Sequence, residues 1–200
     1  MENVEVLNRA FFLLLNASDK TPLWLLYAAT MIAEVLIYFI PLLFVSYWLW
    51  GDVTYRSKIL KACAVTMIAL GLNQMISMFW YHPRPFMIEL GHTWLSHTPD
   101  SSFPSDHMTV FVGVGLTLMF GGMRTAACGA LVAGCAVAWA RIFLGLHFPL
   151  DMVGSLITTS ISYCLVHPLW KWKGDTVVAL AEHMYKITFA KLINAGIVNH

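Results

Sequence analysis

The chain has 200 residues, of which 58% are apolar and only 12% charged, and its mean hydropathy is +0.68. This composition excludes a water-soluble domain, whose surface would have to be far more polar. The apolar runs are continuous rather than alternating, which excludes a membrane β-barrel and predicts an all-α, polytopic membrane helix bundle. The formal net charge of +1 provides no basic surface, so we expect the lipid bilayer as a partner and no nucleic acid.

Five segments are long and apolar enough to cross the hydrocarbon core, which takes about twenty helical residues. Segment 106–123 is the weakest, because its apolar part is short and rich in glycine. Residues 4–16 and 176–195 are amphipathic, so we expect terminal helices at the interface, and a sixth crossing at one end is left open. No linker divides the sequence, which predicts one domain over 1–200. The predicted crossings are 23–50, 62–80, 106–123, 125–144 and 148–170, followed by a cytoplasmic amphipathic tail at 171–200.

The distribution of Lys and Arg predicts which way the bundle faces, because short cytoplasmic loops are enriched in these residues. With five crossings, eight of the twelve Lys and Arg fall on one side and four on the other. We therefore place the loops at 51–61 and 121–124, together with the C-terminal tail, in the cytoplasm. The loop at 81–104 and the turn at 145–148 then face outward together.

Polar residues gather on this outer face in three separate segments. Ionisable residues are costly in a membrane protein, so their clustering indicates function. Taken singly, each has a structural explanation, such as a snorkelling arginine, a helix N-cap or a first-turn acid. Their convergence on one face favours a shared site. The segments are His82-Pro83-Arg84-Pro85-Phe86, Phe103-Pro104-Ser105-Asp106-His107, and the stretch from Arg141 through His147 to Asp151.

These residue types together are suited to phosphoryl transfer. The guanidinium groups of Arg84 and Arg141 carry permanent charge in a forked geometry that matches phosphate oxygens. Backbone N–H groups at the start of the third span offer a further anion site. His147 and Asp151 are four residues apart, so the carboxylate can orient one ring nitrogen and leave the other free as a nucleophile or base. His107 is then available to protonate the departing oxygen.

The three segments resemble the signature of the type-2 phosphatidic acid phosphatase superfamily, which reads K-x6-R-P, P-S-G-H and S-R-x5-H-x3-D. The stretch Asp-x-Ser-Phe-Pro-Ser-Asp-His is similar, more narrowly, to bacterial undecaprenyl-diphosphate phosphatases of the bacitracin-resistance type. Length, the five apolar runs and the amphipathic C-terminal helix are similar too, so the resemblance covers nearly the whole chain. The matching stretches are Ser77 to Arg84-Pro85, Pro104 to His107, and Ala140-Arg141 to His147 and Asp151.

The resemblance implies a role for each matching residue, in a reaction without a metal or other cofactor. His147 is expected to attack phosphorus and form a phosphohistidine, Asp151 to orient it, and His107 to protonate the leaving group. Three residues are expected to hold phosphate oxygens, namely Arg84, Arg141 and Ser105. The implied reaction is hydrolysis of the lipid undecaprenyl diphosphate to undecaprenyl phosphate and phosphate. This recycles the carrier lipid of peptidoglycan synthesis and gives bacitracin resistance, and it implies a bacterial inner (cytoplasmic) membrane with the active site facing the periplasm or cell exterior.

The sequence departs from the signature at three positions. Ser77 replaces the family's lysine and Asp106 its glycine, and the undecaprenyl-diphosphate subgroup commonly shows both changes. Ala140 replaces the serine, which removes one hydroxyl donor and is expected to weaken phosphate contacts without abolishing the reaction. Ser77 and Asp106 are candidate accessory residues, and so is Glu34 near mid-bilayer in the first span. An isolated carboxylate there should be protonated or face the bundle interior toward a partner such as Asn73, Gln74 or one of the arginines.

Alternative functions remain open on the sequence. The same chemistry suits a phosphatase acting on phosphatidylglycerol phosphate or phosphatidic acid, or a phosphotransferase that passes the phosphate to another lipid such as lipid A. A non-enzyme alternative is a small proton-coupled carrier using Glu34, which predicts discontinuous helices and inverted halves. The length of the lipid tail and the oligomeric state are not readable from the residues.

Overall fold

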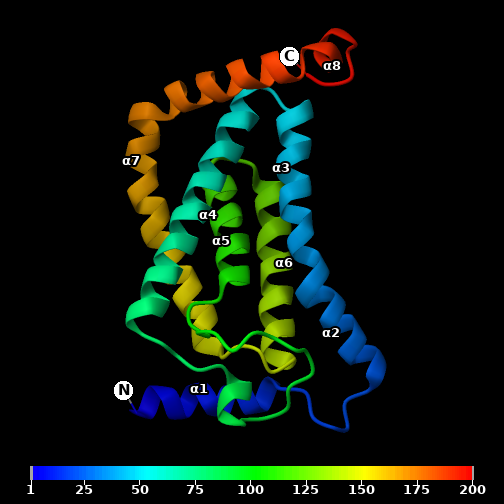
Figure 1. Cartoon of the computed structure of the whole chain (residues 1–200), viewed down its shortest axis with the longest axis vertical. Coiled ribbons are helices and arrows are strands. Elements are labelled where there is room, and N and C mark those ends of the chain that lie inside the picture. Colours follow the sequence, from blue (N-terminus) through cyan, green and yellow to red (C-terminus); the bar gives the residue numbers. More distant parts are fainter. Residues whose placement is uncertain (1, 200) are drawn as a thin grey trace.

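The computed structural model describes residues 2–199, which contain helices and no strand (Figure 1). The predicted all-α class is confirmed. In chain order the elements are α1 (Glu2–Leu15), α2 (Leu23–Val35), η1 (Leu36–Tyr38), α3 (Phe39–Trp50), α4 (Val53–Phe79), η2 (Pro85–Ile88), α5 (Asp106–Phe120), α6 (Arg124–Phe143), α7 (Pro149–Thr188) and α8 (Ala190–Asn194).

Four helical segments are long and apolar enough to cross a membrane, and they coincide with four of the five predicted crossings. The fifth, α5, has 15 residues, or about 22 Å of helix. It packs against α4, α6 and α7, and most of its side chains are buried. A helix enclosed by protein does not have to match the thickness of the hydrocarbon layer. The four long segments are Leu23–Trp50, Val53–Phe79, Arg124–Phe143 and Pro149–Thr188.

Two helices extend beyond the crossings predicted for them. The helix predicted to begin at 62 begins at Val53, because Asp52 caps it: the Asp52 carboxylate accepts the N–H groups of Thr54 and Tyr55 at 2.8 and 3.0 Å. The span predicted to end at 170 continues to Thr188 as one helix through Pro168. A proline inside a helix removes one hydrogen bond and kinks rather than ends it when the flanking turns remain bonded. Figure 1 shows α7 bending, so that its second half lies across the end of the bundle.

The amphipathic helix α1 lies across the opposite end of the bundle, where α4 ends and α5 begins (Figure 1). Side chains of α1 attach it to the turn between α6 and α7. The Asn8 side-chain oxygen accepts the N–H of Leu150 at 3.0 Å, and the ring of Phe12 packs edge-on against Phe148 at 5.3 Å. The Asn16 amide donates to the carbonyl of Phe143 at 3.0 Å. Helix α1 is therefore held against the ends of α6 and α7.

Small residues let α5 approach its neighbours closely. A Cβ added at Gly113 would lie 2.5 Å from the hydroxyl of Thr66 on α4, and one at Gly134 on α6 would lie 2.7 Å from Cβ of Phe111. Close backbone packing of this kind is a common source of helix association in membranes, where no hydrophobic force drives helices together. The middle of α5 is thereby packed closely between α4 and α6.

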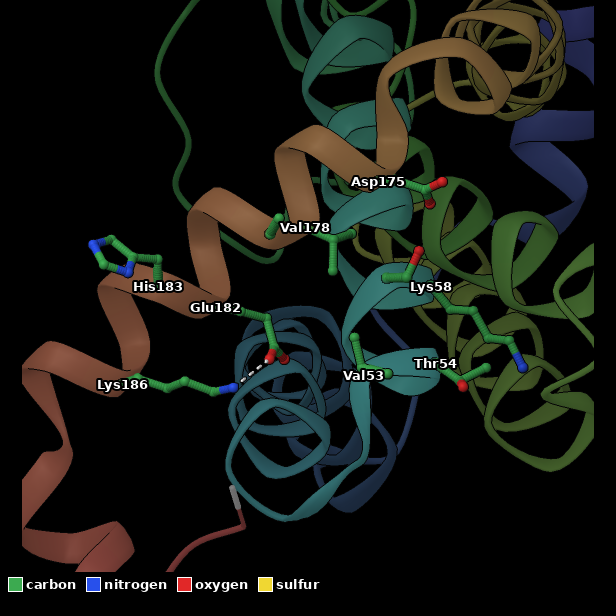
Figure 2. A pocket seen from close by; sticks show the side chains of 10 residues that line it. Val53, Thr54, Lys58, Asp175, Val178, Glu182, His183 and Lys186 are labelled. Carbon is green, nitrogen blue, oxygen red and sulfur yellow. Dashed lines mark ion pairs between the residues drawn. The ribbon is translucent and has the colours of Figure 1, made fainter.

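At the end away from α1, the second half of α7 crosses the first turns of α4 and leaves a cavity of about 680 Å³ between them. Figure 2 shows the side chains that line it, including the ion pair between Lys186 and Glu182, at 3.7 Å. Beside it, Arg56 is fully buried and donates to Glu182 at 2.8 Å. None of the site residues predicted from the sequence lines this cavity.

Candidate active site

A second cavity, of about 330 Å³, lies at the end of the bundle where α1 crosses, between α4, the segment before α5, and α6. Six of the nine candidate residues line it, which confirms that the three sequence segments converge. These six are Ser77, Arg84, Asp106, His107, Arg141 and His147. Asp151 lies directly behind His147, whereas Ser105 and Glu34 are not among the residues of 2–199 that line the cavity.

His147 occupies the tight turn that joins α6 to α7. Gly145 makes this turn with φ of +87°, where an added Cβ would lie 2.2 Å from the carbonyl oxygen of His92. Pro149 then begins α7, which places Asp151 one turn from His147. The Nδ1 atom of His147 lies 3.0 Å from Oδ2 of Asp151, and both side chains are buried. Nδ1 therefore carries the hydrogen, and Nε2 keeps its lone pair on the cavity side.

The surroundings of His147 keep its imidazole neutral. Burial lowers the pKa of His147 to about 4, against the opposing hydrogen bond and charge of Asp151 and with help from the nearby charges of Arg84 and Arg141. A neutral ring with a free Nε2 at pH 7 is the form that attacks an electrophile. Geometry and charge thus both favour a nucleophilic role for this histidine.

Arg84 is buried beside His147 and is held by several partners. Its Nη1 atom lies 3.0 Å from His147 Nε2 and donates to the carbonyl of Leu146, also at 3.0 Å. Its Nε atom donates to Oδ1 of Asp100 at 2.6 Å. Burial raises the pKa of Asp100, but the hydrogen bond and charge of Arg84 outweigh burial and hold this pKa below its usual value. The Arg84 guanidinium therefore points at the place where a phosphorus atom attacked by Nε2 has to lie.

Arg141 is the buried charge that the protein leaves least satisfied. Its side chain is only 4% exposed, and its Nη1 atom makes one long bond of 3.4 Å to the carbonyl of Ala33. Within residues 2–199 its Nε atom has no hydrogen-bond partner. A buried guanidinium is costly unless its donors are used. An anionic ligand in the cavity would supply the missing acceptors.

The candidate accessory residues Asp106 and Ser77 are anchored rather than free. The Asp106 carboxylate accepts from the amides of Asn73 at 2.9 Å and Gln74 at 3.2 Å, which ties the first turn of α5 to α4. The Ser77 hydroxyl donates to the carbonyl of Phe103 at 3.2 Å. His107 follows Asp106 and lines the cavity opposite these contacts. The polar residues of α4 thus hold the start of α5, and with it His107, in place.

Ser105 and Glu34 do not line the cavity, although the backbone N–H of Ser105 donates to the carbonyl of Asp151 at 3.3 Å. Ser105 is fully buried and its hydroxyl accepts the N–H of Met108 at 3.5 Å, so the N-cap that its sequence position suggested is present. Its role toward phosphate stays a prediction. Of the partners expected for Glu34, the structure brings an arginine near it. Glu34 is exposed on α2, beside the packed Ala33 whose carbonyl accepts from Arg141, and its charge acts on the Arg141 guanidinium. The role of Glu34 in the reaction stays a prediction.

Three residues just before Phe103 lie at the site but are not among the nine predicted from the sequence. Asp100 and Ser101 line the cavity, and Ser102 lies behind it against His147 and Asp151. A signal for them existed, because Asp100 and Ser102 belong to the Asp-x-Ser-Phe-Pro-Ser-Asp-His stretch. That stretch was used only as a mark of resemblance and not interpreted residue by residue.

Relatives of known name match the chain over much of its length. It is 32% identical over 193 residues to the putative undecaprenyl-diphosphatase YbjG of Escherichia coli (strain K12), covering 96% of this chain and 98% of YbjG. It is 32% identical over 130 residues to the undecaprenyl-diphosphatase BcrC of Bacillus subtilis (strain 168), covering 65% and 67% of the two chains. It is 29% identical over 136 residues to the bacitracin transport permease protein BcrC of Bacillus licheniformis, covering 68% of this chain and 66% of that protein.

Solved structures show the same fold. LpxE of Aquifex aeolicus superposes with a TM-score of 0.67 at 21% identity, covering 81% of this chain and 95% of LpxE. The PAP2-type phosphatidylglycerolphosphate phosphatase of Bacillus subtilis superposes with a TM-score of 0.58 at 18% identity, covering 86% and 88%. The model of the PAP2 superfamily matches residues 58–175, which include the whole cavity. The chain therefore belongs to the PAP2 superfamily and is a multi-pass membrane protein with the fold of the membrane phosphatases.

Proposed function

We propose that this protein is an undecaprenyl-diphosphate phosphatase, which hydrolyses undecaprenyl diphosphate to undecaprenyl phosphate and phosphate. The relatives named undecaprenyl-diphosphatase support the substrate. The observation that carries the proposal is the buried His147–Asp151 pair facing a cavity in which Arg141 has an unused donor. The products would return the carrier lipid to peptidoglycan synthesis, and the reaction would confer bacitracin resistance.

The reaction proceeds in two steps at the terminal phosphorus. In the first, His147 Nε2 forms a bond to phosphorus, while the bond from phosphorus to the bridging oxygen breaks. His107 gives its proton to the departing lipid phosphate, and Asp151 holds the hydrogen on Nδ1 of the phosphohistidine. In the second, water attacks phosphorus, His107 takes the proton of the water, and the bond to Nε2 breaks. Free phosphate leaves, and His147 is neutral again.

The two arginines stabilise the charge that develops on the transferred phosphoryl group. Arg84 exchanges its contact with His147 Nε2 for a phosphate oxygen when the substrate binds, which frees the lone pair of the nucleophile. Asp100 keeps the guanidinium in position through Nε during this exchange. The unused Nε of Arg141 supplies a further donor. Fixed donors in a buried site stabilise such charge more strongly than water does.

The active site faces the periplasm or the cell exterior, in a bacterial inner membrane. This orientation rests on the excess of Lys and Arg at the other end of the bundle. The helices at that end carry Arg56, Lys58, Arg124, Lys186 and Lys191. An outward site suits a lipid diphosphate that is released on the outer side of the membrane.

The carrier alternative loses its structural basis. It depended on Glu34, which is exposed on α2 and is not among the described residues that line the cavity. Other lipid acceptors and other lipid phosphates share the chemistry of the proposed reaction, so experiment has to separate them.

The direct test is phosphate release by the detergent-purified protein from undecaprenyl diphosphate and from phosphatidic acid, side by side and with chelator present. We expect strong release from the diphosphate by the wild type and none by His147→Ala. Faster release from phosphatidic acid would move the substrate assignment to that lipid. Release that continues unchanged in His147→Ala would overturn the phosphohistidine mechanism.

A further inference from the structure

We propose that Ser102 is a positioning residue: its hydroxyl fixes which oxygen of Asp151 is presented to His147. The inference rests on the proposed function, because it concerns the orientation of the proposed nucleophile. Ser102 lies in the segment before α5 and is fully buried, but it does not line the phosphate cavity. Its action on the reaction therefore has to pass through Asp151 and His147.

The backbone holds Ser102 in place before its side chain makes any contact. The N–H of Ser102 donates to the carbonyl of His82 at 2.7 Å. His82 lies two residues before Arg84, so this bond joins the segment before α5 to the segment that carries the arginine. The short serine side chain has only one torsion to settle, and its hydroxyl is aimed at α7.

Three donors converge on one oxygen of Asp151 and leave the other oxygen without a partner. Oδ2 accepts from the Ser102 hydroxyl, from the N–H of Phe148 at 2.8 Å, and from His147 Nδ1 at 3.0 Å. Oδ1 is buried and has no hydrogen-bond partner within residues 2–199. A carboxylate turns readily about its last torsion, which is broad. The asymmetry indicates that Ser102 and the Phe148 N–H together select Oδ2 as the acceptor for His147.

The same hydroxyl tunes how strongly Asp151 holds the histidine. A hydrogen bond to a carboxylate stabilises its charged form and makes it a weaker base. The charged and titratable groups facing His147 are Asp151 from α7, Arg84 from the segment after α4, His107 from α5 and Arg141 from α6. All of these remain when the Ser102 hydroxyl is removed. With one donor fewer on Oδ2, Asp151 interacts more strongly with the protonated form of His147, and the pKa of His147 rises.

The experiment compares Ser102→Ala, Ser102→Thr and Ser102→Val with the wild type in the phosphate-release assay. Threonine and valine have nearly the same shape and volume. The difference in kcat between these two variants therefore measures the effect of the hydroxyl alone. We expect kcat to fall about tenfold in the alanine and valine variants, a typical cost of losing a partner that orients a reactive histidine, with KM within about twofold. Threonine should restore most of the activity that valine loses. The acid limb of the pH profile of kcat/KM should move to higher pH in Ser102→Ala.

Ser162→Ala is the matched control, because Ser162 is a fully buried serine of α7 whose hydroxyl donates only to the carbonyl of Thr158, at 2.8 Å. It should leave kcat, KM and the pH profile unchanged. In the Asp151→Asn background, Ser102→Ala should add little, because the two residues act as one unit.

If the wild type releases phosphate, three outcomes would overturn the inference. The first is equal activity of the threonine and valine variants, and the second is an acid limb that does not move in Ser102→Ala. The third is a double variant with Asp151→Asn whose loss of activity equals the product of the two single losses. A wild type that releases no phosphate would instead contradict the proposed function.

Discussion

Each end of the bundle buries an arginine, and the two arginines differ in how many of their hydrogen-bond donors have partners. Arg56, at the end where α7 bends, is fully buried and uses each of its three groups: Nε donates to Trp48, Nη1 to Glu182 and Nη2 to Asn199, at 2.8 to 3.0 Å. The Tyr185 ring also lies 4.4 Å from the guanidinium. Arg141, at the α1 end, makes one bond of 3.4 Å and leaves Nε unused.

This difference indicates that Arg56 stabilises the fold, whereas Arg141 has donors available for a ligand. The partners of Arg56 tie together the end of α3, the start of α4, α7 and the C-terminal residues, so its desolvation is compensated within the protein. Arg141 carries a similar desolvation cost. The charges of Glu34, Asp100 and Asp106 offset part of it, but the guanidinium makes only one long hydrogen bond within residues 2–199. Burial alone thus does not distinguish a functional arginine, whereas the number of satisfied donors does.

The largest expected effect is on catalysis at the Arg141 end. Arg141→Ala removes a donor that is used only when phosphate is bound, so we expect kcat/KM to fall about a thousandfold, as for the loss of a preorganised donor to a developing charge. The thermal unfolding temperature should change little or rise, because a buried charge that is only partly compensated is removed. Arg141→Lys, measured in the same assay, should recover only part of the activity. A marked loss of stability without loss of activity per folded molecule would contradict the comparison.

The next effect is on stability at the other end. Arg56→Met keeps most of the volume but removes the donors to Glu182 and to the carbonyls of Trp48 and Asn199, which leaves the partly buried Glu182 with only the longer contact to Lys186 at 3.7 Å. We therefore expect a loss of about 3 kcal/mol in the free energy of unfolding. Thermal unfolding in detergent measures it, alongside phosphate release per folded molecule, which should stay near the wild-type value.

The double variant Arg56→Met with Glu182→Gln is the control for this charge pair. It should regain part of the stability, because the carboxylate that lost its partner is also removed. If the loss in the free energy of unfolding of the double variant equals the sum of the losses of the two single variants, Arg56 and Glu182 do not interact.

A smaller effect is expected for Asp100, which connects the site to a half-exposed loop. Asp100→Asn keeps the shape but loses the charge that holds Nε of Arg84, so kcat/KM should fall about tenfold, within the range for a hydrogen bond between charged groups. Asp175→Asn, on the cavity at the other end, is the matched control and should have no effect. Equal activity of Asp100→Asn and wild type would mean that the remaining bonds of Arg84 suffice.

The subtlest prediction concerns pH. His147 must be neutral to attack, and burial lowers its pKa to about 4 from the ordinary value near 6.5. The nucleophile therefore stays active as the pH falls from 7 toward 5, where an ordinary histidine would already be protonated. The acid limb of kcat/KM, measured from pH 4 to 8 and corrected for the separately measured titration of the substrate phosphate, should lie well below 6.5. A limb near 6.5 would indicate an exposed histidine.

Much of the site was predictable because its residues lie in short motifs. The spacing of His147 and Asp151 predicts their pairing. The pairing is present although His147 lies in the turn before α7, because Pro149 begins the helix and places Asp151 in its first turn. Because the apolar runs cross the same bilayer, the ends that carry Arg84, His107 and Arg141 lie on the same membrane face. Asp100 and Ser102 could not be assigned in this way, because they reach the site through an irregular segment whose path no periodicity describes.

The sequence by itself determined the all-α class, the crossing segments and the outline of a phosphate site, because hydropathy and helical spacing act locally along the chain. Only the tertiary structure decided that α7 continues past Pro168, that Glu34 is exposed on α2 yet acts on Arg141, and that Arg56 is a buried anchor rather than a loop residue. It also decided which buried donors are used and which are left free. Hydrogen-bond satisfaction depends on partners far apart in the sequence, such as Arg141 with Ala33 or Arg56 with Asn199, and these meet only when the helices pack.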